Sequence, residues 1–213
     1  MAGAFRAIAC GVCLLALAGC STSAGLPSPG FLNAAIARAY IPLEGYAYLI
    51  LDAHGAGVRI APGVAVTNAH NANLVDDKKV IGISHDYDLL FFRDEKNASL
   101  VEGVPYVGER VIAYGQGLDG DLRQATGSVT ALSSPVLPHC KGCPIQQAFV
   151  FDAPAGKGFS GGPVVDAQSG ALLGITFGFL DSARGETRRH MYAYDMARVK
   201  TELAKVRAAK PTH

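Results

Sequence analysis

The stretch GKGFSGGPVVD, residues 156–166, places glycines on both sides of one serine, Ser160, and follows them with a proline and a short apolar run. A serine hydroxyl is a weak nucleophile, and it needs a general base as well as donors for the oxyanion that its attack creates. Glycines let the backbone turn so that several N–H groups point at one spot, and a plain turn needs fewer of them. We therefore predict that Ser160 is a nucleophile and that the N–H groups of Gly158 and Ser160 form an oxyanion hole.

The same residues also fit a second motif, because Gly158, Ser160 and Gly162 satisfy the G-x-S-x-G pattern of α/β-hydrolases. In those enzymes the nucleophile joins a buried strand directly to a helix. Here the residues before the serine read as a loop, and those after it read as a proline followed by a strand. An acid and a histidine would also have to follow the serine, and Asp181 and His190 lack a supporting pattern. An esterase of this type is the less favoured alternative.

A candidate base ends the stretch VAVTNAH, residues 64–70, which reads as a strand that breaks at His70. A histidine at a strand end can accept the serine proton, and a carboxylate has to orient its ring. The stretch SHDYDLLFFR, residues 84–93, offers Asp86 and Asp88. We favour Asp88 because it directly precedes an apolar run and would be desolvated at the edge of a buried strand, whereas Asp86 reads as a solvated turn residue.

The order His70, Asp88, Ser160 and the three stretches around these residues resemble the catalytic motifs of trypsin-like (chymotrypsin-fold) serine peptidases. The similarity is greatest to the bacterial high-temperature-requirement-like branch and covers roughly residues 45–208. It implies two antiparallel six-stranded β-barrels with the site in the cleft between them. It also implies a serine endopeptidase that acts on proteins or peptides and uses no cofactor. Further matching stretches are VGERVIAYGQG (107–117), TGSVTAL (126–132) and GALLGITFG (170–178).

Three departures from the family pattern carry expectations of their own. The interval from His70 to Asp88 is 88 − 70 = 18 residues, which is short for the family and predicts a trimmed hairpin in the first barrel. Phe159 stands where the digestive enzymes carry an aspartate, so we expect packing of Phe159, and not a freed N-terminal amine, to order the oxyanion loop. With the sequence ending at residue 213, we expect no peptide-binding domain of the kind that often follows in that branch.

The resemblance to the family also implies where the specificity pocket lies. Its floor falls near Pro154 and its wall near Phe177–Phe179, and these positions carry no charge. We therefore expect a small or apolar P1 side chain.

Composition and periodicity agree with a β-rich domain. The chain has 213 residues, 25 of them glycine, and its apolar residues occur in short runs, which favours an all-β fold. The formal charge of +1 gives no indication of nucleic-acid binding. The end of the chain differs, because Met196, Val199, Leu203 and Val206 recur at the spacing of one helix face. We predict a C-terminal α-helix there, with Asp195 as its N-cap.

The first twenty residues have the layout of an export signal: a positive charge at Arg6, an apolar stretch and then small residues. Residues 17–20, LAGC, resemble the lipobox of bacterial lipoproteins, which implies cleavage before Cys20 and a lipid on its thiol. An ordinary secretory signal or an uncleaved anchor is the alternative. We expect a signal peptide over 1–19, a lipidated cysteine and flexible tether over 20–39, and a peptidase domain over 40–213. Ser21 favours the outer membrane of the cell envelope if the host is Gram-negative.

The remaining cysteines, Cys140 and Cys143, lie close together between two prolines. In an oxidising compartment this spacing favours a small-ring disulfide. A thioredoxin-like redox pair, or a zinc site with His139 as a third ligand, is the alternative, and we predict no metal site. For the whole chain the leading hypothesis is a membrane-anchored serine endopeptidase. Its rival is a catalytically latent, protease-like lipoprotein that acts as a binding module.

Overall fold

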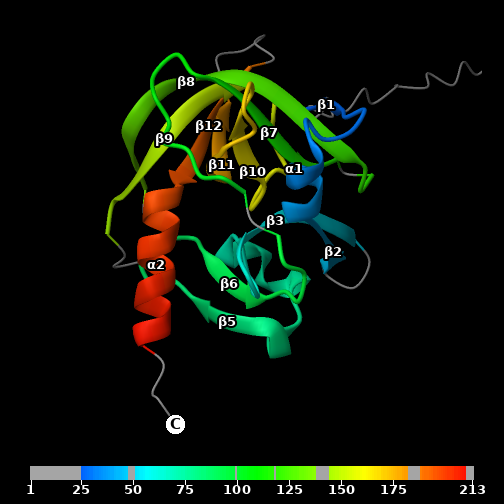
Figure 1. The fold of residues 1–213 in the computed structure, drawn as a ribbon, viewed down its shortest axis with the longest axis vertical. Helices are drawn as coiled ribbons and strands as arrows, with labels where there is room; N and C mark the ends of the chain where they lie inside the picture. Colours follow the sequence, from blue (N-terminus) through cyan, green and yellow to red (C-terminus); the bar gives the residue numbers. More distant parts are fainter. Residues whose placement is uncertain are drawn as a thin grey trace, which may run out of the picture.

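The computed structural model describes residues 25–47, 51–98, 100–117, 119–137, 144–181 and 188–209. Two antiparallel sheets and a C-terminal helix make up most of this part of the chain (Figure 1). The observed architecture is therefore mostly β, as the short apolar runs predicted.

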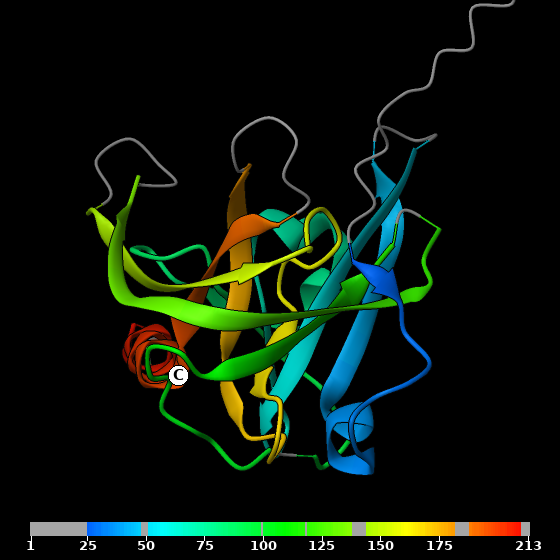
Figure 2. The same ribbon diagram turned by 90° about the horizontal axis from the view of Figure 1, so that it is seen from above.

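The larger sheet contains a closed barrel of six strands. Its order is β1-β8-β7-β10-β11-β12-β9, and an additional pairing of β8 with β9 closes the ring and leaves β1 outside it. Strand β8 pairs with both β7 and β9, and its register with β9 shifts at two places, so that it bends around the barrel (Figure 2). The strands are β1 (Leu26–Pro27), β7 (Arg110–Gln116), β8 (Leu122–Val136), β9 (Gln146–Ala153), β10 (Pro163–Asp166), β11 (Leu172–Asp181) and β12 (Arg189–Asp195).

The smaller sheet has five strands in the order β2-β3-β4-β6-β5, and no pairing joins β2 to β5 within the described residues. The prediction of a six-stranded barrel in this half is therefore not confirmed. The chain from β4 to β6 is short and holds only two 3-10 turns and one strand, which agrees with the predicted trimmed hairpin. The elements are β2 (Tyr40–Ala47), β3 (Leu51–Ala61), β4 (Val64–Thr67), η1 (Ala69–Leu74), η2 (Asp77–Lys79), β5 (Val80–Ile83) and β6 (Leu90–Arg93).

The C-terminal helix, α2 (Met196–Ala208), packs where the two sheets meet (Figure 1). The side chain of Asp195 accepts a hydrogen bond from the Arg198 backbone N–H at 2.7 Å, so the predicted N-cap is confirmed. The predicted apolar face is buried in one cluster that also contains Val66 of the smaller sheet and Ile175 of the larger one. This shared core fixes the two sheets, and the loops between their strands, relative to each other.

Residues 25–39 are part of the fold, which corrects the prediction of a flexible tether over residues 20–39 in this stretch. Strand β1 pairs with β8, and the Asn33 side chain caps the helix α1 (Ala34–Ala39) by accepting from the Ile36 N–H at 3.0 Å. Ile36 is buried. The centroid of the Phe31 ring lies 5.2 Å from that of the Tyr40 ring and 5.1 Å from that of the Tyr114 ring. The burial of Ile36 and the ring contacts of Phe31 hold this segment against the fold. The sequence does not predict this, because the residues before Phe31 are polar and rich in proline.

Several predictions fall on residues outside the described part of the chain. They are the signal peptide over 1–19, lipidation at Cys20, and the disulfide, redox or zinc alternatives at His139, Cys140 and Cys143. Among the residues that are described, no helix combines the length and the apolar character needed to span a membrane, and no cluster of three metal-ligating side chains occurs.

Candidate active site

The structure pairs His70 with Asp88 through two contacts. His70 lies in the 3-10 turn η1, directly after β4, and its backbone N–H donates to Asp88 Oδ1 at 3.0 Å. The ring atom Nδ1 lies 2.6 Å from Asp88 Oδ2. The Asp88 side chain is 13% exposed and the His70 side chain 48% exposed. A carboxylate at Nδ1 fixes the tautomer that leaves Nε2 available as a base, which is the arrangement that a general base in acyl transfer requires.

The other candidate carboxylate, Asp86, points elsewhere. Its side chain contacts His85 at 3.1 Å and the ammonium group of Lys205 at 3.0 Å. The hydrogen bond from His85, followed by that from Lys205, holds the pKa of Asp86 below its ordinary value. The expectation that Asp88, and not Asp86, is the partner of His70 agrees with this geometry.

Ser160 lies in the loop between β9 and β10, and the first half of the molecule holds this loop by its backbone. The Ser160 carbonyl accepts from the Ala56 N–H at 2.9 Å and from the Asn71 side-chain amide at 3.1 Å. Asn71 is the residue after His70 and is buried. The loop that carries the candidate nucleophile is therefore bonded to the turn that carries the candidate base.

The backbone around Ser160 leaves no space for a side chain at its glycine positions. Gly158 has φ +86°, and a Cβ atom built on it would lie 2.0 Å from the carbonyl oxygen of Gln116. The backbone N–H of Gln116 donates to the Gly158 carbonyl at 3.0 Å. The Phe159 side chain, which is fully buried, belongs to the core of the closed barrel. This packing holds the loop from inside the barrel, as expected for a chain without the aspartate of the digestive enzymes.

Within the part of the chain that the structure describes, three polar groups of this loop have no protein partner. Within the residues that the structure describes, the backbone N–H groups of Gly158 and Ser160 donate to no protein acceptor, and the Ser160 hydroxyl makes no hydrogen bond. Two free N–H groups are what an oxyanion hole offers to a substrate. The bond between Ser160 and His70 that a triad uses is not formed here, and catalytic hydrogen bonds are often long before substrate binds.

The residues predicted to line a specificity pocket lie beside a buried cation. The Phe177 ring stacks on Tyr194 at 3.9 Å, and the Phe179 ring lies 4.8 Å from the guanidinium carbon of Arg189. Arg189 is buried and donates to the carbonyl of Ala155 at 2.8 Å. The sequence does not predict a role for Arg189, because nothing in the alternation of β12 distinguishes it. It does not predict one for Asn71 either, since it offers no signal for that residue.

The α/β-hydrolase alternative does not fit the structure. Ser160 is followed by a strand of an antiparallel barrel and not by a helix. Ring atom Nδ1 of His190, the histidine considered for that alternative, lies 2.6 Å from Asp152 Oδ1 across the β12–β9 pairing. The side chain of Asp181 is outside the described residues.

Comparisons with known proteins agree with the fold. No family model matches the chain. A curated relative, "Protease Do-like 1, chloroplastic" of Arabidopsis thaliana, is 31% identical over 125 residues, which are 55% of this chain and 28% of the relative. The chain thus matches less than a third of the length of that protein.

Among solved structures, the active form of the Rv3671c protease of Mycobacterium tuberculosis superposes with a TM-score of 0.67 at 21% identity, over 88% of this chain and 90% of that one. The MamO protease domain of Magnetospirillum magneticum superposes with a TM-score of 0.59 at 17% identity, over 79% of this chain and 97% of that one. The HtrA-type protease AlgW with a tripeptide superposes with a TM-score of 0.61 at 17% identity, over 81% of this chain and 62% of that one. The chain therefore has the fold of trypsin-like serine proteases, and the resemblance found in the sequence is confirmed at that level.

Proposed function

We propose that this chain is a serine endopeptidase in which Ser160 is the nucleophile, His70 the general base and Asp88 the carboxylate that orients it. The observation that carries the proposal is the double contact of Asp88 with His70, at the backbone N–H and at Nδ1. Isolated His–carboxylate pairs are common, but this one lies on a turn bonded through Asn71 to the Ser160 carbonyl. The fold shared with serine proteases supports the same assignment.

The reaction follows from these positions. His70 Nε2 takes the proton of the Ser160 hydroxyl as its oxygen attacks the scissile carbonyl carbon, and Asp88 stabilises the imidazolium that forms. The N–H groups of Gly158 and Ser160 bind the oxyanion, and one such donor contributes about 3 kcal/mol. The imidazolium then protonates the leaving amine as the C–N bond breaks, which leaves an acyl ester on Ser160. Water, deprotonated by His70, hydrolyses that ester and restores the serine hydroxyl.

A peptide is the substrate class that this assignment requires. AlgW, one of the proteases with this fold, was solved with a tripeptide. The test is digestion of a pool of synthetic peptides by the detergent-solubilised full chain, with new N-termini identified by mass spectrometry. We expect cleavage that a serine-directed phosphonate blocks. A purified, folded protein that yields no new N-terminus would contradict the proposal.

A specific observation favours a second candidate function, a latent binding module. The Ser160 hydroxyl makes no hydrogen bond to His70 within the described residues. In a latent protein the same peptides would bind without being cut. The digestion separates the two functions when it is run beside a binding measurement on the same peptides.

We also propose that the chain is anchored to a membrane by a lipid on Cys20. The sequence LAGC at residues 17–20 supports this role. A single acyl chain binds a membrane only marginally, and the several chains of a bacterial lipoprotein anchor stably.

The anchor gives a separate prediction. In the native host, Cys20→Ala is expected to abolish incorporation of an alkyne-tagged palmitate, because the variant lacks the thiol at the predicted cleavage site. Cys13→Ala is the matched control, since it alters a cysteine in the same leader and should leave incorporation unchanged. Incorporation that persists in Cys20→Ala, or that never occurs in the wild type, would contradict the anchor.

A further inference from the structure

The turn that precedes Asp88 is organised around one buried hydroxyl, that of Ser84. Its oxygen accepts the backbone N–H of Asp86 at 3.2 Å and that of Tyr87 at 3.1 Å. The Ser84 N–H in turn donates to the Leu89 carbonyl at 2.9 Å. The backbone from residue 84 to residue 89 is thus closed on itself, and Asp88 lies within the closed segment.

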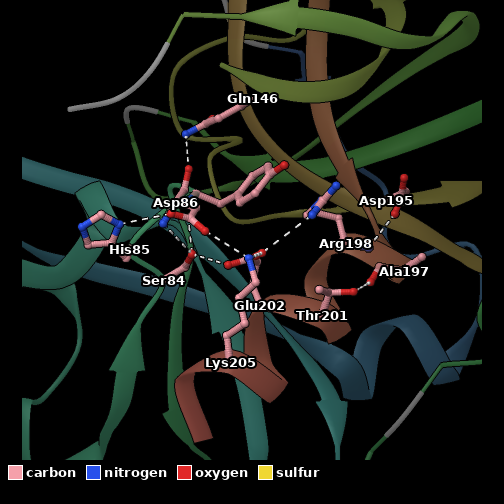
Figure 3. A network of polar contacts seen from close by, with 11 residues as sticks. Ser84, His85, Asp86, Gln146, Asp195, Ala197, Arg198, Thr201, Glu202 and Lys205 are labelled. Carbon is pink, nitrogen blue, oxygen red and sulfur yellow. Dashed lines mark hydrogen bonds and ion pairs between the residues drawn. The ribbon is translucent and has the colours of Figure 1, made fainter. Parts of the chain in front are cut away.

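The proton of this hydroxyl is directed at a carboxylate of the C-terminal helix. Ser84 Oγ donates to Glu202 Oε2 at 2.7 Å (Figure 3). Glu202 is 1% exposed, which is exceptional for a glutamate, and buried carboxylates are retained only where other groups compensate for the lost hydration. Lys205 supplies this compensation by donating to Glu202 Oε1 at 2.9 Å, and the Arg198 guanidinium lies 3.8 Å from the same oxygen.

Two more side chains of α2 hold the same turn. The ammonium group of Lys205 also binds Asp86 Oδ2 at 3.0 Å, so that one cation joins the helix to the turn (Figure 3). The guanidinium of Arg198 lies over the Tyr87 ring, 4.6 Å from its centroid. Successive turns of one helix therefore contact Ser84, Asp86 and Tyr87.

The closed barrel holds the turn from the other side. Gln146 of β9 donates its side-chain amide to the Asp86 carbonyl at 3.0 Å, and the Tyr194 hydroxyl donates to the Gln146 side-chain carbonyl. The Tyr194 ring meets Tyr87 edge-on at 5.2 Å. Burial raises the pKa of Tyr194, and the negative charge of nearby Asp88 raises it further, so its hydroxyl stays a donor.

We propose that Glu202 is a positioning residue: through Ser84 it fixes the turn 84–88 and thereby holds Asp88 against His70. The inference rests on the proposed function, in which the Asp88–His70 pair prepares the base. It adds that the pair depends on a carboxylate from the last helix of the chain, 114 residues after Asp88 (202 − 88 = 114). A misplacement of about 1 Å caused by a distant substitution can lower a rate by about 10²-fold.

The test compares Glu202→Leu and Ser84→Ala in the detergent-solubilised full chain. The leucine removes the acceptor without leaving a buried unpaired charge, and the alanine removes the hydroxyl that organises the turn. We expect each variant to lower the rate of fluorophosphonate labelling by about 10²-fold. The double variant should be no slower than the worse single variant, because Ser84→Ala already removes the contact that Glu202→Leu breaks. Glu202→Gln keeps an oxygen that can accept from Ser84 and should recover most of the rate.

Lys200→Ala is the matched control. Lys200 lies on the same helix and binds Glu102 at 2.7 Å, away from the turn 84–88. We expect labelling at the wild-type rate from this variant. Thermal unfolding is measured for every variant. It identifies any variant whose labelling is slow because the protein is no longer folded.

A second readout does not depend on activity. The proton on Nδ1 of His70, held 2.6 Å from a carboxylate oxygen, should give a far-downfield proton NMR signal. His70→Ala assigns it. We expect the signal to weaken or vanish in Glu202→Leu and Ser84→Ala, and to persist in Glu202→Gln and Lys200→Ala.

The outcomes separate the inference from the proposed function. If the wild type is labelled, and Glu202→Leu is labelled equally fast with an unchanged His70 signal, the inference is overturned and the proposed function stands. If the wild type is not labelled, the proposed function fails. The NMR signal then still decides whether Glu202 positions the pair.

Discussion

Asp88→Asn is expected to lower kcat for peptide hydrolysis by about 10⁴-fold while the protein stays folded. Asp88 accepts two hydrogen bonds from His70, and a side-chain amide cannot accept both. An asparagine facing Nδ1 favours the tautomer in which Nε2 carries the proton and cannot act as a base. It also withdraws the negative charge that stabilises the imidazolium. The measurement is kcat on a peptide identified in the digestion experiment, with thermal unfolding as a check on folding.

Asp152→Asn is the matched control for this prediction. Asp152 lies 2.6 Å from His190 Nδ1, so the substitution breaks a contact of the same length and the same chemistry between β9 and β12 of the closed barrel. We expect kcat to change by less than about threefold, because surface substitutions of this kind have small effects. If Asp152→Asn lost activity and Asp88→Asn kept it, the assignment of the base would move from His70 to His190.

Gly161→Ala is expected to lower the free energy of unfolding by more than about 4 kcal/mol. Losses of this size occur when the structure cannot accommodate the new side chain. Gly161 has φ +81°, and a Cβ atom there would lie 2.0 Å from the Ala56 carbonyl oxygen and 2.3 Å from the Thr67 hydroxyl. Neither group can withdraw, because Ala56 belongs to the paired strand β3 and its carbonyl accepts from Thr67 at 2.6 Å. The free energy of unfolding in urea measures the effect.

Gly63→Ala separates the two causes of that loss. Gly63 has φ +73°, but a Cβ atom there would meet nothing within 4 Å. We expect a cost of roughly 1–2 kcal/mol, which is that of the left-handed backbone alone. Equal losses in the two variants would show that the approach of the Ser160 loop to β3 is looser than the structure indicates.

The parts of the site that the sequence predicted share a local signature. Glycines flank Ser160 because its loop packs closely against the backbone of neighbouring segments. An apolar run follows Asp88 because β6 is buried. His70 lies in the turn η1 that follows the buried strand β4. The apolar spacing in residues 196–206 predicted a helix because one face of it is buried, and the structure has that helix.

The parts that the sequence missed depend on contacts between distant segments. Asn71 matters because its amide reaches the Ser160 carbonyl, and Glu202 because it meets Ser84, 118 residues away. Neither partner is visible from local periodicity. The fold of residues 25–39 was missed for a related reason, since Ile36 and Phe31 are isolated apolar residues whose burial depends on β8 and Tyr114.

The most direct test of the central claim is the rate of fluorophosphonate labelling of the full chain, with the modified residue located by mass spectrometry. The claim is that His70, held by Asp88, activates Ser160. It predicts rapid labelling of Ser160 in the wild type, none in Ser160→Ala, and a rate near that of unassisted hydroxyls in His70→Ala. A folded wild type that is not labelled, or that is labelled equally fast without His70, would contradict it.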